Sequence, residues 1–239
     1  MRRVFLCPLG PLDDGRLGRK GTIIAISLPN GSTISIGDLG SPKTISALSN
    51  ANPGVATAAA HGYSDGDIVV ISSGWSRLDG RVVRVDNSDT GTFALEGMDT
   101  TDTDRYPAGS GVGSATEVTA WTQISQVLSS TTDGGEQQFA TYSFLEDGNE
   151  RRIPTTKSAR GMTITLGDDQ SLAWFAKLVA ADDDRLPRPI RIQLPSGAAI
   201  YENAYVTINK TPTLNQNEVM GLTATLSFVA EAVRYAPAA

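Results

Sequence analysis

One pentapeptide of this chain has the residue types of a hydrolase active site. Gly62–Gly66 reads GYSDG and matches the G-x-S-x-G turn that presents a nucleophilic serine, and the single histidine, His61, stands directly before it. That turn needs a strand before it, a helix after it and a histidine later in the chain. Here Asp67–Ser72 has the composition of a strand, and no histidine follows Ser64. We therefore interpret Gly62–Gly66 as a turn in a β structure and predict no catalytic residue.

Other motifs indicate neither a cofactor nor a metal site. The segment Gly109–Ser114 (GSGVGS) lacks the spacing of a dinucleotide-binding G-x-G-x-x-G and opens no clear helix. The acidic clusters Asp99–Asp104 and Asp182–Asp184 lack the ligand order of an EF-hand, and we interpret them as solvated loops, or, for the second, as partners for bases of another subunit. One cysteine beside one histidine leaves too few soft ligands for a structural zinc site. We predict no cofactor and no bound metal.

Composition excludes several function classes. The chain has 239 residues, a formal net charge of −6 and a pI of about 4.8, so a DNA-binding protein that works by neutralising phosphates is disfavoured. The apolar run after Arg2 and Arg3 stops at Cys7-Pro8, too short for a signal peptide, and no later run approaches a membrane span. Twenty-four glycines and twelve prolines among short Val/Ile/Thr-rich runs favour a mainly β protein.

The elements that would position any site are strands and one helix. Alternation of apolar and polar residues predicts strands at Gly161–Leu166, Ala199–Asn209 and Val219–Val229. A helix is predicted to begin after Asp168 as the N-cap, with an apolar stripe at three- and four-residue spacing and Trp174 within it or at its edge. The stripe consists of Leu172, Phe175, Leu178 and Val179. Near the N-terminus we expect strands at Thr22–Leu28 and Thr33–Ile36, joined at Asn30-Gly31, and later one at Phe139–Leu145.

Charge and turn residues divide the chain into two units. Residues 43–130 contain ten acids and five bases, so they hold five of the six excess negative charges of the chain. Turn-rich segments flank them at Gly37–Pro42 and Ser129–Gly135. We interpret 43–130 as a small inserted all-β domain in an exposed loop, with short strands such as Arg81–Val85 and Thr92–Leu95. Residues 1–42 and 131–239 then form one discontinuous β-sandwich or barrel-forming domain with one flanking helix.

The C-terminal strands have an unusual second face. It consists of hydroxyl, amide and tyrosine side chains with almost no charge, which is typical of a structural surface and not of an active site. A protein surface of this kind either meets bulk water on a monomer or lines an internal space, and the pattern alone leaves both open. The residues proposed to face such an internal space are Tyr201, Glu202, Asn203, Tyr205, Thr207, Thr223, Thr225 and Ser227.

At the level of whole segments the chain resembles a known family. Arg151–Leu166, the helix segment that follows, and the ending NEVMGLTATLSFVAEAVRY resemble the major tail tube protein of long-tailed, non-contractile phages, closest to the Chi type. Residues 51–74 resemble a small β module that recurs as a decoration in phage tail and fibre proteins. The first forty residues match only loosely.

The resemblance implies a structural role. Such subunits form hexameric rings that stack into a hollow tail, and the bore conducts phage DNA without binding it. It implies as partners other copies of the chain, a tape measure protein and tail tip or terminator proteins, with no membrane, and a location in the virion tail after assembly in the host cytoplasm. The inserted domain is expected on the outer surface.

Two other function classes remain open from the sequence. Trp75, Trp121 and Trp174 would suit a carbohydrate- or host-surface-binding module if their rings were exposed. A hydrolase would require the Gly62–Gly66 turn to be catalytic.

Overall fold

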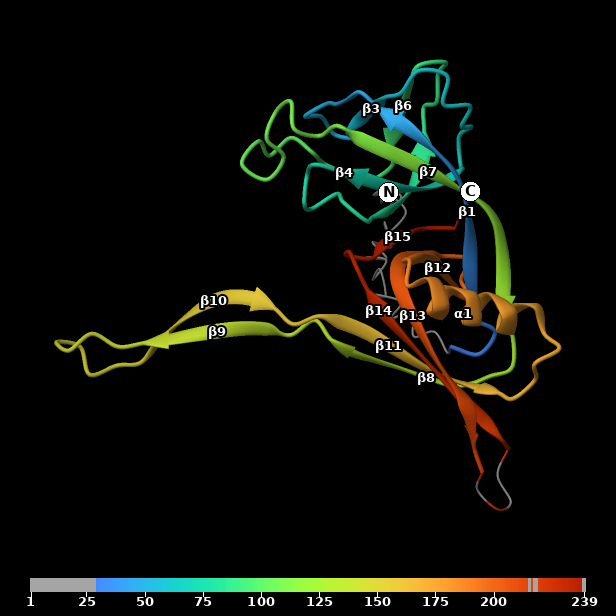
Figure 1. Ribbon diagram of the computed structural model, residues 1–239. Coiled ribbons are helices and arrows are strands. Elements are labelled where there is room, and N and C mark those ends of the chain that lie inside the picture. The colour runs from blue at the N-terminus through green and yellow to red at the C-terminus, as the bar shows by residue number, and fades with distance from the viewer. Residues whose placement is uncertain (1–28, 215, 217–218, 238–239) are drawn as a thin grey trace, which may run out of the picture.

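The described part of the protein is mainly β with one helix, as predicted. The computed structural model describes residues 29–214, 216 and 219–237, and in this part of the chain strands dominate (Figure 1). The strand predicted at Thr22–Leu28 lies outside the described residues. The turn at Asn30-Gly31 is present, with Gly31 at a φ of +91° and the Ser32 N–H bonded to the Pro29 carbonyl at 2.9 Å.

Six antiparallel strands, which belong to one continuous 13-stranded sheet in the described residues, form the body of the molecule, with α1 packed on one face (Figure 1). The strands pair in the order β1-β12-β13-β14-β11-β8, so the three C-terminal strands predicted from the alternation lie side by side. The short β15, Val233–Tyr235, pairs with the start of β13. The body strands are β1 Thr33–Ile45, β8 Val127–Gly134, β11 Arg160–Gly167, β12 Arg188–Gln193, β13 Ala199–Thr213 and β14 Gly221–Phe228.

The helix α1, Ala173–Asp184, covers the apolar side of this sheet. Trp174, Leu178 and Ala181 are buried in it, and the predicted stripe residues Leu172, Phe175 and Val179 pack at the edge of the same core. Trp174 is 1% exposed and therefore central to the core. Spacing thus predicted the helix and Leu178 as a buried residue, but the buried side is centred on Trp174, Leu178 and Ala181, and the other three stripe residues flank it.

Both predicted ends of the helix were wrong. The N-cap residue is Leu172 without a side-chain cap, because a turn separates Asp168 from the helix and Asp169 instead accepts bonds from the Ser171 N–H and hydroxyl. The run Asp182–Asp184, read as a solvated loop, forms the last helical turn, and Arg185 ends the helix at a φ of +55°. Ion pairs with Lys210 and Arg188 offset the charge of Asp183 and Asp184 at the negative end of the helix dipole.

A second all-β unit forms above the body from the middle of the chain (Figure 1). Its own core contains Trp75, Leu78 and Phe93, each at most 1% exposed. The strands pair in the order β2-β3-β6-β5-β4-β7. They are β2 Ala47–Leu48, β3 Val55–Thr57, β4 Ile68–Ser73, β5 Val82–Asp86, β6 Thr92–Leu95 and β7 Gly113–Ile124.

Two long strands pass from the body into this second unit. β1 and β7 pair from Ile34↔Ile124 to Ile45↔Gly113, with a bulge beside Asp38. Gly37–Pro42, read as a flexible boundary, is therefore continuous strand, and a Cβ at Gly37 would come within 2.5 Å of the Val118 side chain. Ile124 lies in the core under α1, so the packing favours an inserted unit of about residues 45–115 over the proposed 43–130. The division into two domains remains a proposal.

A β-ribbon extends from the body as an arm (Figure 1). β9, Gln137–Tyr142, and β10, Arg151–Lys157, pair only with each other in the described chain. At the arm's base the Ser158 N–H donates to the Glu136 carbonyl at 2.9 Å. The predicted strand Phe139–Leu145 corresponds to β9, which begins two residues earlier and ends at Tyr142.

Candidate functional site: a hydroxyl-lined sheet face

The face of the body sheet opposite α1 is lined by hydroxyl groups in register across four strands. Alternate residues of β11, β14 and β13 point into the helix-covered core, so the residues between them point to the opposite face. The pairing of β8 with β11 places Ser129, Thr131 and Asp133 in line with that opposite face. Cross-strand pairing arranges these residues in three rows. The rows are Thr131-Thr163-Thr225-Thr207, Ser129-Thr165-Thr223-Asn209 and Asp133-Gly161-Ser227-Tyr205.

This face carries almost no charge. Of its twelve positions nine bear a hydroxyl group, Asp133 is the one acid, and none is Lys or Arg. Neighbouring strands lie about 4.8 Å apart, so the rows form a continuous polar surface. Such a surface can be wet and can present hydrogen-bonding groups to a passing anion, but it has no positive charge to hold one.

Five of the eight predicted residues lie on this face. Tyr205, Thr207, Thr225 and Ser227 are exposed, and Thr223 is half-buried. All five were chosen from sequence alternation, and the pairing of β13 with β14 brings them together. Whether the face lines an internal space is a separate question that rests on assembly.

The other three predicted residues are buried within the subunit, so their exposure was predicted wrongly. Tyr201 packs against the rings of Trp121 and Tyr235, because β15 and the inserted unit cover the start of β13. Asn203 is 3% exposed. Alternation gives the direction of a side chain but not what covers it.

Glu202 is buried in an ion pair within the subunit. Its carboxylate pairs with Arg160 at 2.8 Å and is 6% exposed. Burial raises the pKa of Glu202, and the charge of Arg160 opposes that rise. Glu202 thus joins β13 to the start of β11 and presents no charge on the open face.

Sequence reasoning missed one strand of this face. Ser129, Thr131 and Asp133 lie on β8, within a segment read as a linker because Ser, Thr, Asp and Gly are turn residues. Thr163 and Thr165 had been assigned to the polar side of their strand but were not proposed as site residues. Ser129 and Thr131 alternate in the same way as Thr163 and Thr165, and this shared pattern could have indicated that β8 pairs with β11.

The two outer edges of this face are unpaired in the described chain. β8 has β11 as its single partner, and Tyr205–Thr213 of β13 pairs with β14 alone because the pairing of β13 with β12 ends at Ala204↔Arg188. An unpaired edge presents a row of N–H and C=O groups that can template another strand. The face can therefore be extended on both sides by other copies.

The candidate catalytic turn has no catalytic geometry. The Ser64 N–H donates to Asp67 Oδ2 at 2.7 Å, as in a tight turn, and the segment leads into β4 and not a helix. Both ring nitrogens of His61 are engaged with backbone: Nδ1 accepts from the Tyr63 N–H at 3.0 Å and Nε2 lies 2.7 Å from the Asp89 carbonyl oxygen. His61 therefore holds the loop together and does not reach Ser64 as a base.

The tryptophans offer no bare aromatic platform. Trp75 and Trp174 are each 1% exposed, and the Arg191 guanidinium lies over the ring of Trp121 at 4.8 Å. Within the described residues no group of three or more His, Cys, Asp or Glu side chains is arranged to hold a metal ion. None of the helical structure in that same part of the chain is long and apolar enough to cross a membrane.

Comparison with known proteins identifies the class of this fold and surface. The sequence profile of the family described as phage tail tube protein, TTP, matches residues 73–237, well over half of the chain. The chain therefore belongs to the phage tail tube protein family.

Among solved structures the chain is similar to tube components of contractile injection systems, at low identity. One is the sheath-tube complex of an extracellular contractile injection system (PVC) in its extended state, with 15% identity, a TM-score of 0.35 and coverage of 44% of this chain and 79% of that one. Another is the tube terminating cap of the anti-feeding prophage, with 17% identity, a TM-score of 0.33 and coverage of 44% and 78%. A search of curated proteins gave no significant match.

Proposed function

We propose that this protein is the structural subunit of the hollow tail tube of a long-tailed, non-contractile phage, and that it is not an enzyme. Six copies join edge to edge into a ring, rings stack into a tube, and the hydroxyl-lined face lines the bore. The observation that carries the proposal is this nearly uncharged face flanked by two unpaired strand edges. Family membership supports the tail tube role, and the sequence resemblance supports the non-contractile class.

Joining the edges explains why both are free in one subunit. β8 of one copy and Tyr205–Thr213 of the next can pair as strands, so that four strands per copy extend into a continuous barrel. Closure satisfies the backbone groups and removes the edges that would otherwise promote uncontrolled association. A repeated head-to-tail contact of this kind closes into a ring when its rotation divides a full turn.

The chemistry of the face suits the passage of DNA. Each Lys or Arg that contacts a phosphate releases a counterion and adds to binding affinity, so a basic wall would hold the DNA. Hydroxyl groups and the single Asp133 of each copy present no such charge. The proposed partners are further copies, a tape measure protein and tail tip or terminator proteins, in a virion tail assembled in the host cytoplasm.

A proline scan of Tyr205–Ile208 tests the shared barrel. Backbone N–H groups alternate in direction along a strand, so two of the four positions donate toward β14 and the other two toward the open edge. Proline removes the N–H group. The Val229 N–H donates to the Asn203 carbonyl, so Tyr205 and Thr207 donate toward β14 and the two open-edge positions are Val206 and Ile208. Both of these side chains lie in the core, so each proline variant is compared with the alanine variant at the same position. We expect both alanine variants to form tubes and both proline variants to stay folded but lose tubes in negative-stain microscopy, whereas Thr225→Pro on the doubly paired β14 should lose the fold. Normal tubes from all four scan variants would refute the edge contact.

A charge placed on the face tests the bore. Thr207→Lys adds one base per copy, and each phosphate contact steepens the log-log salt dependence of duplex binding by about 0.9. We expect tubes or virions to assemble but DNA ejection to slow, with the defect relieved at high salt. Thr207→Gln is the matched uncharged control. Unchanged ejection in well-formed Thr207→Lys and Thr225→Lys tails would show that this face does not line the bore.

A further inference from the structure

The base of the arm borders a cleft that no assigned role explains. It has a volume of about 500 Å³ and lies between the inserted unit, the base of the arm and the segment that leads from β14 to β15. Its lining includes apolar groups from Phe228, Val229 and Ala232 and the bases Arg77, Arg81 and Lys157. A cleft of this size with a mixed lining suits a few side chains of a protein loop.

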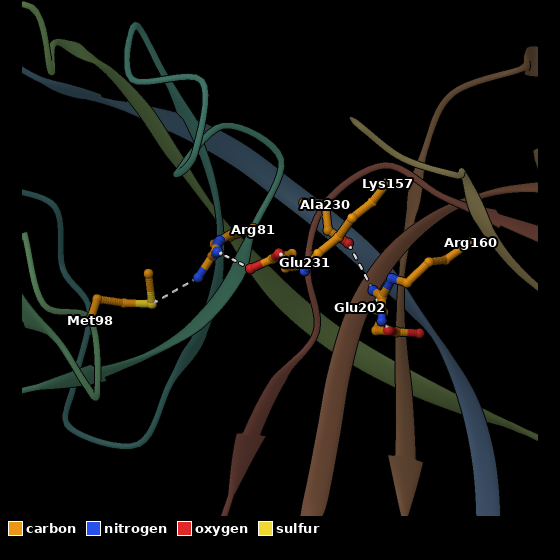
Figure 2. A network of polar contacts seen from close by, with 7 residues as sticks. All are labelled: Arg81, Met98, Lys157, Arg160, Glu202, Ala230 and Glu231. Carbon is orange, nitrogen blue, oxygen red and sulfur yellow. Dashed lines mark hydrogen bonds and ion pairs between the residues drawn. The ribbon is translucent and has the colours of Figure 1, made fainter. Parts of the chain in front are cut away.

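The basic side of the cleft has more donors than acceptors. Figure 2 shows Arg81, Lys157 and Glu231 together, with Glu231 paired to Arg81 at 2.9 Å and lying 3.7 Å from Lys157. Arg81 also donates to the weak acceptor Met98 Sδ at 3.7 Å, and its buried Nε has no partner in the described chain. One carboxylate therefore serves two bases, and the five donors of a guanidinium meet a single strong acceptor.

The charged side chains that line the cleft, taken together with Glu202, sum to a positive charge. Arg160 pairs with Glu202 and also donates to the Ala230 carbonyl at 3.1 Å (Figure 2). The Asp79 carboxylate accepts from the Ser73 N–H at 3.0 Å. Four bases thus face the three acids Asp79, Glu202 and Glu231, with Arg77 exposed at the entrance. The cleft can accept one further carboxylate.

The tip of the arm has the complementary composition. Residues 143–150 (SFLEDGNE) contain three acids and no base, and Leu145 is fully exposed. Two contacts restrict the loop: Asp147 pairs with Arg151, and the Arg151 guanidinium lies over the Phe144 ring at 5.6 Å. A restricted loop loses less conformational entropy on docking.

We propose that the arm tip of one copy docks into this cleft on a second copy, with Leu145 against the apolar side and Glu146 near Arg77. The inference rests on the proposed tube, in which copies are adjacent. The arm extends roughly 30 Å from its base, so the two copies would be offset by about that distance. The same contact repeats from copy to copy, because tip and cleft occupy different parts of one chain.

Cross-linking tests the contact directly. In a Cys7→Ser background, Leu145→Cys and Ser76→Cys proteins are mixed, assembled into tubes and oxidised. We expect disulfide-linked dimers that contain one of each variant. Leu145→Cys mixed with Thr90→Cys, at an exposed site far along the inserted unit, is the matched control and should give none.

A charge exchange provides the second measurement. Arg77→Glu and Glu146→Arg should each raise the concentration needed for tube formation about threefold to tenfold, and the combined variant should restore it. Tubes that form normally without a Leu145–Ser76 cross-link would overturn the docking alone, as would failure of the exchange to restore assembly. A wild-type chain that never forms tubes would instead overturn the proposed function.

Discussion

The inserted unit and the arm are two β structures attached to one body, and they differ in what stabilises them. The inserted unit surrounds its own buried core of Trp75, Leu78 and Phe93. The arm is a two-stranded ribbon whose β10 is exposed at every residue, with Phe139 and Ile153 each more than half exposed. A lone two-stranded hairpin is marginally stable in water. The inserted unit therefore folds on intramolecular contacts, whereas the arm needs a partner.

The largest expected effect comes from where the inserted unit is cut. Replacing residues 43–115 with a Gly/Ser linker leaves the β1/β7 pairs nearest the body and the helix-covered core, so we expect a soluble folded body. Replacing 43–130 also removes Ile124 from the core under α1 and part of β8. We expect this variant not to fold and therefore to show no cooperative unfolding transition. Thermal melts followed by circular dichroism measure both. Equal melting curves for the two deletion variants would show that β7 beyond residue 115 belongs to the inserted unit.

Removing the arm should abolish assembly and leave the subunit folded. Glu136 and Ser158 already lie within hydrogen-bond distance, so a short Gly turn can replace residues 137–157 without strain. We expect the melting temperature to change by less than about 2 °C and tubes to be absent at a hundredfold higher concentration. Sedimentation and negative-stain microscopy measure the second effect. Normal tubes would mean that the arm makes no necessary contact.

Matched aromatic truncations compare the two regions at the level of one side chain. Trp75 is fully buried and its Nε1 donates to the Pro107 carbonyl at 2.8 Å, so Trp75→Ala should destabilise the inserted unit by about 3–5 kcal/mol. Phe139→Ala on the arm should change subunit stability by less than about 0.5 kcal/mol. Urea unfolding of the monomer gives both values. A large loss from Phe139→Ala would show that the arm packs against its own body.

The sequence revealed the elements whose apolar residues recur with one period. The alternation in Ala199–Asn209 and the spacing of Leu172, Phe175 and Leu178 predicted β13 and α1, because both are set by which face meets the core. Five of the face residues followed from the same alternation. These features depend on local periodicity alone.

The features that the sequence did not reveal depend on distant partners. Ser129–Gly135 reads locally as a turn, yet the ladder from β11 makes most of it a strand. Tyr201 has the alternation of an exposed residue, yet β15 and the inserted unit cover it. The whole of β10 lacked a core-facing pattern because the arm has no core. Each error arose where pairing or covering by a remote segment overrode local preference.

Tyr235 links the inserted unit to the body, and Tyr63 lies wholly within the inserted unit. The Tyr235 hydroxyl accepts from the Arg84 N–H at 2.8 Å and donates to the Glu96 carbonyl at 3.1 Å. The Tyr63 hydroxyl donates to the Ala115 carbonyl at 2.7 Å. Burial raises the pKa of each tyrosine to about 12.

Removing these hydroxyls should have a smaller effect than removing the buried Trp75 ring. Tyr235→Phe leaves two backbone groups unpaired and should cost about 1–3 kcal/mol, and Tyr63→Phe leaves one and should cost about 0.5–1.5 kcal/mol. In the unfolded chain a tyrosine ionises near pH 10, so the wild type should lose stability as pH rises from about 10 to 12, where the unfolded phenols ionise first. Each Phe variant should show a shallower loss of stability at alkaline pH, measured by urea unfolding at a series of pH values.

If the Tyr235 hydroxyl couples the two units, Tyr235→Phe should also separate the unfolding of the inserted unit from that of the body, whereas Tyr63→Phe should not. A single transition of unchanged width in Tyr235→Phe would show that the two hydrogen bonds of the Tyr235 hydroxyl are not needed to couple the units.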